Sequence, residues 1–171
     1  RTQMTGKKVT NKMVFDKLRG KSGSTVNVSI LRSGLKKPIE FKITRDKIPL
    51  YSIDIAYMVK PGIGYMKISK FAATTYDEYL KAFNDLTKKG MKKLIIDLRG
   101  NGGGFLKTAV DLADEFLING LQIVYTAGRA HPKKAYNSTT QGGFEKNPIV
   151  VLIDEGSASA SEIVAGALQD N

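Results

Sequence analysis

Two short stretches of the sequence contain residues that could do chemistry. Residues 97–104 read DLRGNGGG, with four glycines in five positions, and residues 154–163 read DEGSASASEI, with three serines at alternate positions. A glycine-rich backbone that precedes a helix exposes N–H groups, which favour a negative charge such as a phosphate or a developing oxyanion. A serine at a helix N-terminus can act as a nucleophile, because the same N–H groups stabilise an alkoxide or an oxyanion.

The spacing of the glycines argues against a nucleotide phosphate. The motif GxGxxG fails because the position three after Gly102 is Phe105, and the motif GxxxxGK[ST] does not occur in the sequence. A tight strand-to-helix turn without a ligand stays open for this stretch taken alone. However, four glycines in five positions are more than a turn requires.

The serine stretch has a structural interpretation beside the catalytic one. Ser159 and Glu162 match S-x-x-E, a capping box in which the serine oxygen and the glutamate carboxylate accept backbone hydrogen bonds at a helix start. The nucleophile motifs G-x-S-x-G and S-x-x-K are absent from this stretch. The only histidine, His131, lies beside Pro132 in a polar region, and we interpret it as an exposed residue rather than a triad base. These residues alone leave both interpretations open.

Alternating strands and helices must position both stretches. Residues 94–99 and 149–154 are near-continuous apolar runs, typical of strands that are buried in a parallel sheet. Apolar periodicity also predicts strands at 63–68 and 121–127, helices at 74–90, 105–118 and 160–170, and a long polar loop at 127–148. This order indicates an α/β fold with a mainly parallel sheet, in which sites lie at the carboxyl ends of the strands. Both stretches follow such strand ends.

The first part of the sequence has a different pattern. A short helix is expected at 11–18, and it is followed by a glycine-bounded turn and two alternating runs, STVNVSILR and IEFKITR, which predict a β-hairpin. This part is small to stand alone, so other parts of the protein must cover it. We therefore expect two domains, residues 1–47 and residues 48–171.

Composition sets limits on function. The chain has 171 residues and 42% hydrophobic content, enough to bury a core, and it has no cysteine, which excludes disulfides, thiolate metal sites and a cysteine nucleophile. The formal net charge is +11, but the basic residues are scattered rather than gathered in one aromatic-rich block, so no nucleic-acid partner is expected. No apolar run reaches the roughly 18 residues of a membrane span. No metal or cofactor is expected.

Taken together, DLRGNGGG and DEGSASASEIVAGALQDN resemble two motifs of the carboxyl-terminal processing proteases, S41-type serine peptidases that are also called tail-specific proteases. The motifs occur in that family in the same order. Residues 5–32 resemble the second half of the family's PDZ domain, and residues 51–171 resemble most of its protease core. The resemblance implies a crotonase/ClpP-like βαβ core with a mainly parallel sheet, preceded by a partial PDZ-like α+β segment.

The resemblance also implies roles for residues of both stretches. The family uses a Ser-Lys dyad, in which a neutral lysine takes the proton of the serine, and the position of its nucleophile matches Ser159. The oxyanion would lie against the backbone N–H groups of Ala160 and of Gly103, with Gly104 close by. Glu162 matches a polar position that supports the family's site.

Asp170 matches a second supporting position, but another part of the family's site is missing. The family's lysine, and the glutamine that follows it, lie downstream of the Gln-Asp pair, beyond Asn171, so none of the lysines present matches that motif. Gly102 also stands where the family often has proline. The resemblance therefore implies that this fragment is inactive, because it lacks its general base.

The PDZ-like part implies that a substrate C-terminus is captured beside its helix, at Lys12, Val14, Phe15 and Leu18. The expected partners are protein or peptide substrates with nonpolar C-termini. The expected location is the cell envelope, either the periplasm or a membrane anchor that faces it. Membrane association and formation of a homo-oligomer stay open.

Two other functions fit the same fold. A non-catalytic protein that binds a peptide or another ligand would use the serines only as a helix cap and the glycines only as a turn. An acyl-CoA enzyme would also use paired backbone N–H groups as an oxyanion hole, but it would need neither the serines nor the PDZ-like part.

Overall fold

Residues 8–46 and 51–171 are described by a computed structural model, in which the chain divides into two units, residues 1–50 and 51–171. Each unit is described by itself. The domain boundary that the sequence predicts, after residue 47, lies outside the described residues.

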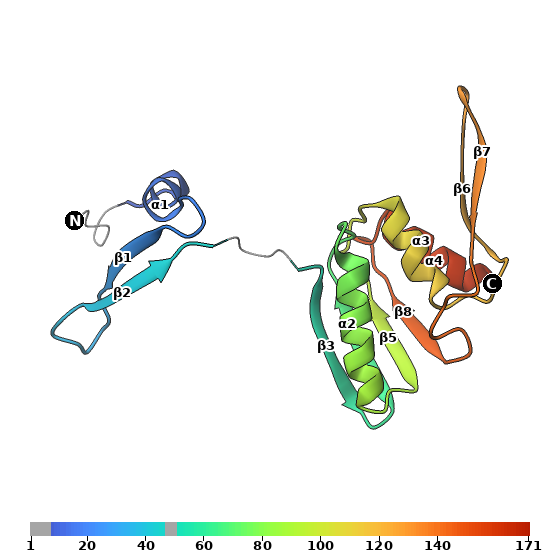
Figure 1. The fold of residues 1–171 in the computed structure, drawn as a ribbon, viewed down its shortest axis with the longest axis horizontal. Coiled ribbons are helices and arrows are strands. Elements are labelled where there is room, and N and C mark those ends of the chain that lie inside the picture. Colours follow the sequence, from blue (N-terminus) through green and yellow to red (C-terminus); the bar gives the residue numbers. More distant parts are fainter. Residues whose placement is uncertain (1–7, 47–50) are drawn as a thin grey trace. The chain divides into compact units, whose positions relative to one another are not determined.

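The first unit contains one helix and one β-hairpin (Figure 1). Helix α1 spans Asn11–Leu18, and strands β1, Thr25–Ile30, and β2, Ile39–Thr44, pair antiparallel. The side chain of Thr10 caps the helix by accepting a hydrogen bond from the Met13 N–H at 3.3 Å. This is the element order that the sequence predicts. No described residue of this unit is buried, so the unit has no closed core of its own.

The second unit is built on a four-stranded sheet of order β3-β4-β5-β8. The strands span Ile53–Lys60, Ile63–Ile68, Lys93–Asp97 and Ile149–Leu152. Strands β4, β5 and β8 run parallel, whereas β3 pairs antiparallel with β4 at the edge of the sheet. The α/β fold is therefore the expected one, but its sheet is mixed.

Strand β3 is an element that the sequence analysis missed. A tight turn at Pro61 and Gly62 joins it to β4, and Gly62 has a φ of 79°, which favours glycine. The register shifts twice along the β3–β4 pair, so the apolar alternation of β3 is interrupted. The proline-glycine turn is the signal that could have predicted this hairpin.

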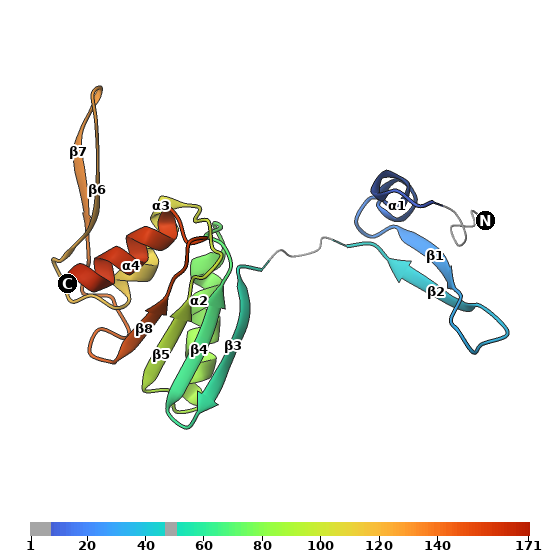
Figure 2. The ribbon, with the colours of Figure 1, turned by 180° about the vertical axis from the view of Figure 1, so that it is seen from behind.

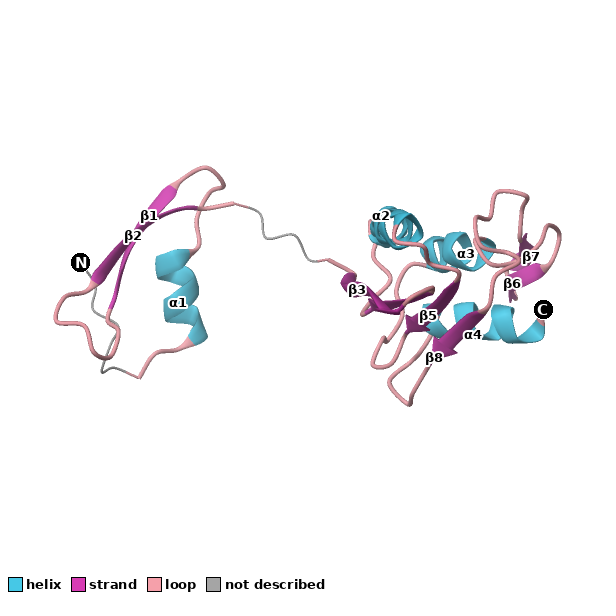
Figure 3. Cartoon of the chain, turned by 90° about the horizontal axis from the view of Figure 1, so that it is seen from below, coloured by secondary structure: helices cyan, strands magenta, loops and turns pink. Residues whose placement is uncertain are grey.

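Three helices pack with the sheet: α2, Thr75–Lys88; α3, Leu106–Asp114; and α4, Ala160–Asp170. Helices α2 and α3 cover one face of the sheet (Figure 3), and the strands lie in front of α2 when the unit is seen from behind (Figure 2). The core between them contains Met66, Ile68, Tyr79, Phe83, Leu94, Ile96 and Leu112. Within residues 8–46 and 51–171, no helix has the length and apolar content needed to cross a membrane.

The prediction of a long polar loop is wrong in part, because a further hairpin of the second unit lies there. Strand β6, Gln122–Gly128, pairs antiparallel with β7, His131–Asn137, and stands out from the rest of the unit (Figure 1). The loop was expected at 127–148, but part of it is strand. Most residues of β7 are exposed, so the strand lacks the apolar alternation by which a half-buried strand is recognised. His131 is exposed in β7.

Candidate active site

The two predicted stretches lie side by side at one edge of the sheet. Strands β5 and β8 are parallel, with Asp97 opposite Leu152, so the segments that follow them leave the sheet at the same edge. We call residues 100–104 the glycine loop and residues 154–161 the serine turn. One carboxylate oxygen of Asp154 accepts hydrogen bonds from the Gly100 N–H at 2.8 Å and the Gly156 N–H at 3.0 Å. This carboxylate ties the two segments together.

The three serines of the serine turn have different surroundings. Ser157 Oγ donates to the carbonyl oxygen of Leu98 at 2.8 Å, and the buried Ser161 Oγ donates to the carbonyl oxygen of Asn101 at 2.8 Å. Ser157 therefore connects the serine turn to the end of β5, and Ser161 connects it to the glycine loop. Ser159 differs because it is exposed.

Ser159 also has an unusual backbone. Its φ of 54° and ψ of −114° make it the one non-glycine residue with a positive φ in the described part of the chain. Such a conformation is strained for a residue with a Cβ, and it persists where the surrounding structure holds it, commonly at functional sites. Ser159 stands directly before α4, so its side chain lies at a helix N-terminus.

The glycine loop lies in direct contact with Ser159. A Cβ added to Gly103 would be 2.8 Å from Ser159 Cβ, 2.7 Å from the Ala158 carbonyl oxygen and 2.9 Å from the Ala160 nitrogen. Real Cβ atoms do not approach other atoms this closely, and Gly103 also has a φ of 98°. Glycine is therefore required here for two separate reasons.

The backbone N–H groups of the predicted oxyanion site are not equivalent. The Gly103 N–H donates to Asn101 Oδ1 at 2.9 Å. By contrast, neither the Gly104 N–H nor the Ala160 N–H has an acceptor among the described residues. Ala160 is the first residue of α4, whose N–H groups have no partner within the helix. Of the three N–H groups predicted for the oxyanion site, those of Gly104 and Ala160 are therefore without an acceptor in the described part of the chain, whereas that of Gly103 is engaged.

The predicted supporting residues lie at opposite ends of α4. The Ser159 N–H donates to Glu162 Oε2 at 2.7 Å, so the capping box read from the sequence is present. Asp170 is ten residues beyond Ala160, which puts it about 15 Å further along the helix. The structure brings Glu162 to Ser159 but does not bring Asp170 there.

Asp97, at the end of β5, is a buried charge that sequence analysis did not assign. Arg99 donates to both of its carboxylate oxygens, at 3.0 and 2.7 Å, and Tyr65 Oη donates at 2.6 Å. The Arg99 guanidinium above all holds the pKa of Asp97 well below its usual range. Likewise, the Gly100 N–H lowers the pKa of Asp154. Both carboxylates accept several hydrogen bonds, and a lowered pKa makes a carboxylate a weaker base, so the geometry favours a structural role for both.

No base for Ser159 is found among the described residues, because no lysine or histidine side chain there hydrogen-bonds to it. Lys67 Nζ, on β4, donates to the Arg99 carbonyl oxygen at 3.0 Å. His131 lies on the separate β6–β7 hairpin.

The predicted peptide-binding residues lie on α1 in the first unit. Lys12 pairs with Asp16 at 3.1 Å, and the Arg19 guanidinium lies 3.8 Å from the centre of the Phe15 ring. Phe15 and Leu18 are exposed, and Val14 is half-buried. Their apolar surface is available in this unit, and their role in peptide binding stays a prediction.

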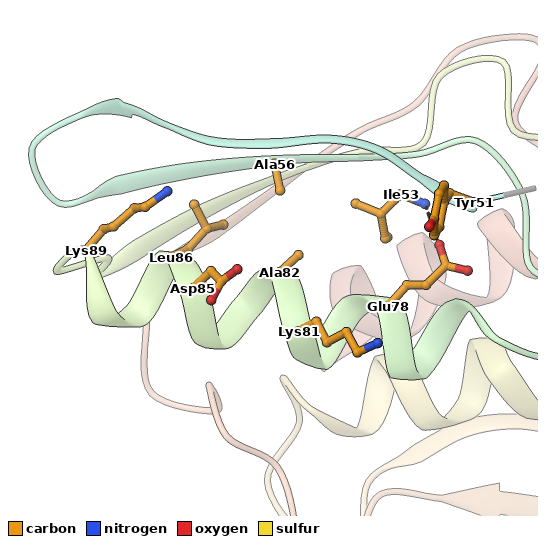
Figure 4. Close-up of a pocket in the computed structure, with 9 residues that line it drawn as sticks. All are labelled: Tyr51, Ile53, Ala56, Glu78, Lys81, Ala82, Asp85, Leu86 and Lys89. Carbon is orange, nitrogen blue, oxygen red and sulfur yellow. Dashed lines mark hydrogen bonds between the residues drawn. The ribbon is translucent and has the colours of Figure 1, made fainter. Parts of the chain in front are cut away.

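A pocket lies between β3 and α2, and none of the predicted site residues lines it (Figure 4). Glu78 Oε2 accepts hydrogen bonds from the Ser52 N–H at 2.6 Å and the Ile53 N–H at 3.1 Å at one end of it. The lining residues are Tyr51, Ile53, Ala56, Glu78, Lys81, Ala82, Asp85, Leu86 and Lys89. It does not contain the nucleophile candidate.

The chain is similar to known proteins. The sequence model of peptidase family S41 matches residues 62–171. The chain is 38% identical over 169 residues to the carboxy-terminal processing protease CtpB of Bacillus subtilis, covering 98% of this chain and 35% of that protein. It is 36% identical over 178 residues to the carboxy-terminal-processing protease of Bartonella bacilliformis, covering 99% of this chain and 40% of that protein. The solved structure of a photosystem II D1 C-terminal processing protease aligns with a TM-score of 0.62 and 29% identity, over 92% of this chain and 44% of that one. This chain spans less than half the length of each.

Proposed function

The chain belongs to peptidase family S41, and from this membership we propose that it is part of a serine endopeptidase that cleaves exported proteins near their C-termini, with Ser159 as the nucleophile. The observation that carries the proposal is the contact between Gly103 and Ser159, where a Cβ on Gly103 would be 2.8 Å from that of Ser159. The contact brings the glycine loop beside a strained, exposed serine at a helix N-terminus, and this arrangement supports a role in acyl transfer to serine.

In the proposed reaction, Ser159 Oγ attacks the carbonyl carbon of the scissile peptide bond while a base takes its proton. The carbonyl oxygen becomes an oxyanion, which the N–H groups of Ala160 and Gly104 stabilise, because both lack other acceptors among the described residues. The Gly103 N–H would join them only if it left Asn101 Oδ1. Glu162 holds the Ser159 backbone through the capping box.

The proposed base is the family's lysine, which the resemblance puts downstream of Asn171. A lysine that its surroundings keep neutral can take the serine proton and return it to the leaving amine. The 171 residues by themselves should then be inactive.

The first unit has a proposed role in substrate choice. It would present the α1 surface at Lys12, Val14, Phe15 and Leu18 to a nonpolar substrate C-terminus that adds as a strand to the sheet. Because the proposed substrates are exported proteins, the proposed location of the protein is the cell envelope.

A non-catalytic binding protein of the same fold is the second candidate. It is favoured by one observation: the Gly103 N–H is bonded to Asn101 in the free chain, and a glycine loop that serves only as a turn needs no free donor. The two candidates differ in whether Ser159 reacts.

A peptidase assay separates them. The 171-residue chain and a longer chain that extends through the downstream lysine are compared on a peptide with a nonpolar C-terminus. The longer chain should hydrolyse the peptide, and the 171-residue chain should be about two to four orders of magnitude slower. Ser159→Ala in the longer chain should lose about four to six orders of magnitude, while Ser69→Ala, an exchange outside the site, should keep full activity. Equal rates for the two chains, or none in both, contradict the dyad.

A further inference from the structure

Asn101 is a buried polar residue in the glycine loop, and both polar atoms of its side chain have a hydrogen-bond partner. It has no exposed surface, although its amide has both a donor and an acceptor. The amide nitrogen donates to the carbonyl oxygen of Ile68 at 2.9 Å, and Oδ1 accepts from the Gly103 N–H at 2.9 Å. These two partners fix the orientation of the amide, since a carbonyl oxygen can only accept and an N–H can only donate.

The backbone carbonyl of Asn101 holds the serine turn on both sides of Ser159. It accepts hydrogen bonds from the Ala158 N–H at 3.1 Å and from Ser161 Oγ at 2.8 Å. One residue thereby connects the end of β4, the glycine loop, and the residues that flank the nucleophile candidate. A buried amide is costly unless its hydrogen bonds are made, so an asparagine in this position fixes one geometry.

We propose that Asn101 is a positioning residue of the site, which fixes the position of the glycine loop relative to Ser159. The inference rests on the proposed function, because it takes Ser159 as the nucleophile and takes the glycine loop and the first residue of α4 as the sources of the oxyanion donors. Asn101 does not touch the reacting atoms. Its task is to keep the Ala158–Ser161 segment and the loop backbone at a constant separation, so that the oxyanion donors are in place before the substrate arrives.

The first test measures the loop itself and does not depend on catalysis. Amide hydrogen exchange is followed by NMR in the 171-residue chain, in the wild type, in Asn101→Leu and in Asn101→Asp. Asn101→Leu removes the acceptor of the Gly103 N–H and should speed its exchange about tenfold or more, while amides of β4 and α2 stay protected. The Ala158 N–H keeps its backbone acceptor, so its exchange should rise because the loop moves. Asn101→Asp keeps an acceptor for Gly103, so Gly103 should remain protected, which makes the proposal testable even if Asn101→Leu does not fold. Unchanged exchange at Gly103 and Ala158 in Asn101→Leu, or a loss of Gly103 protection in folded Asn101→Asp, overturns the proposal.

The second test measures the effect on the reaction in the longer, active chain. Asn101→Leu should lower kcat about 10-fold to 100-fold and change KM less than about twofold, because positioning acts on the transition state and not on substrate binding. The matched control is Ser138→Ala, which removes a buried hydroxyl that bonds to the Leu121 N–H at 3.0 Å, away from the site. The control should lose stability but keep kcat. Equal kcat in Asn101→Leu and the wild type overturns the positioning role and leaves Ser159 as the nucleophile. Absence of Ser159-dependent hydrolysis in the wild type removes the proposed function, whereas the exchange data still decide what Asn101 holds.

Discussion

Ser157, Ser159 and Ser161 lie within five residues of one another, yet their side chains have separate tasks. The Ser157 hydroxyl donates to the carbonyl oxygen of Leu98, directly after β5, and the Ser161 hydroxyl donates to the carbonyl oxygen of Asn101 in the glycine loop. These bonds hold Ser159 in a conformation that it would not adopt in a free chain. At the scale of single residues, the outer serines therefore help to hold the middle one in place. Gly103 allows the glycine loop to approach Ser159 closely, because it has no Cβ.

Replacing Gly103 with alanine tests this close approach. The new Cβ would lie 2.7 to 2.9 Å from atoms of Ala158, Ser159 and Ala160, and the φ of 98° disfavours alanine as well. We expect the free energy of unfolding to fall by about 1 to 3 kcal/mol. Gly102→Ala is the matched control, because nothing lies within 4 Å of its added Cβ, and its effect should stay within about 0.5 kcal/mol. Urea denaturation measures both; equal effects would contradict the contact.

At the scale of elements, the carboxyl ends of β4 and β5 are joined by charge as well as by backbone hydrogen bonds. Asp97 of β5 accepts hydrogen bonds from Tyr65 of β4 and from Arg99, and Lys67 of β4 lies 3.7 Å away. The Tyr65 hydroxyl donates a hydrogen bond to this carboxylate, which raises the pKa of Tyr65. The glycine loop begins directly after this cluster, so the cluster fixes the position from which the loop starts.

The Asp97 cluster should make stability depend on pH. Because the Arg99 guanidinium above all lowers the pKa of Asp97 in the folded state, its stabilisation is complete above the ordinary carboxyl pKa of about 4 and declines as the pH falls below it. Asp97→Asn should cost about 1 to 3 kcal/mol at pH 7, and the cost should shrink from pH 4 downward. Urea denaturation at pH 7, 5, 4 and 3 measures it. The control is Asp111→Asn, whose partner Lys107 is exposed, and its cost should stay below about 0.5 kcal/mol. A cost for Asp97→Asn that grows toward acid contradicts the assignment.

At the scale of the whole molecule, the two units differ in how much they bury. All buried residues in the described part of the chain lie between Ser52 and Ala167, in the second unit. The helix and hairpin of the first unit leave Phe15, Leu31 and Phe41 exposed. The second unit therefore contains the core on which folding depends.

Cutting the chain between the units tests this division. Residues 51–171 alone should unfold cooperatively, with a midpoint within about 3 °C of the 171-residue chain, because the core is intact. Residues 1–50 alone should show no cooperative transition, since a unit of this size without a closed core is not stable. Circular dichroism melting curves of the three chains decide it. A cooperative transition for residues 1–50, or a second unit that does not fold alone, would contradict the division.

Local pattern predicted most elements because their signals lie within a few residues. Helices α1, α2 and α4 and strands β5 and β8 follow from apolar periodicity, caps and stops. The same reasoning failed where both faces of a strand are exposed, as in β7, and where bulges interrupt alternation, as in β3. Helix α3 ends at Asp114, whereas the apolar spacing predicted an end near residue 118. The spacing continues beyond the helix because Phe116 and Leu117 are also buried.

The sequence by itself determined the family and singled out the two candidate stretches, because both depend on residue types at short spacing. The membership in peptidase family S41 confirms the resemblance that DLRGNGGG and the serine stretch predicted. Only the tertiary structure decided which serine is exposed and strained, which N–H groups are available, and that Asn101 connects them. The physical reason is distance along the chain: Ser161 Oγ bonds to a carbonyl oxygen 60 residues away, and Asp154 bonds to an N–H 54 residues away. No local pattern contains such pairings, which exist only once β5 and β8 lie side by side.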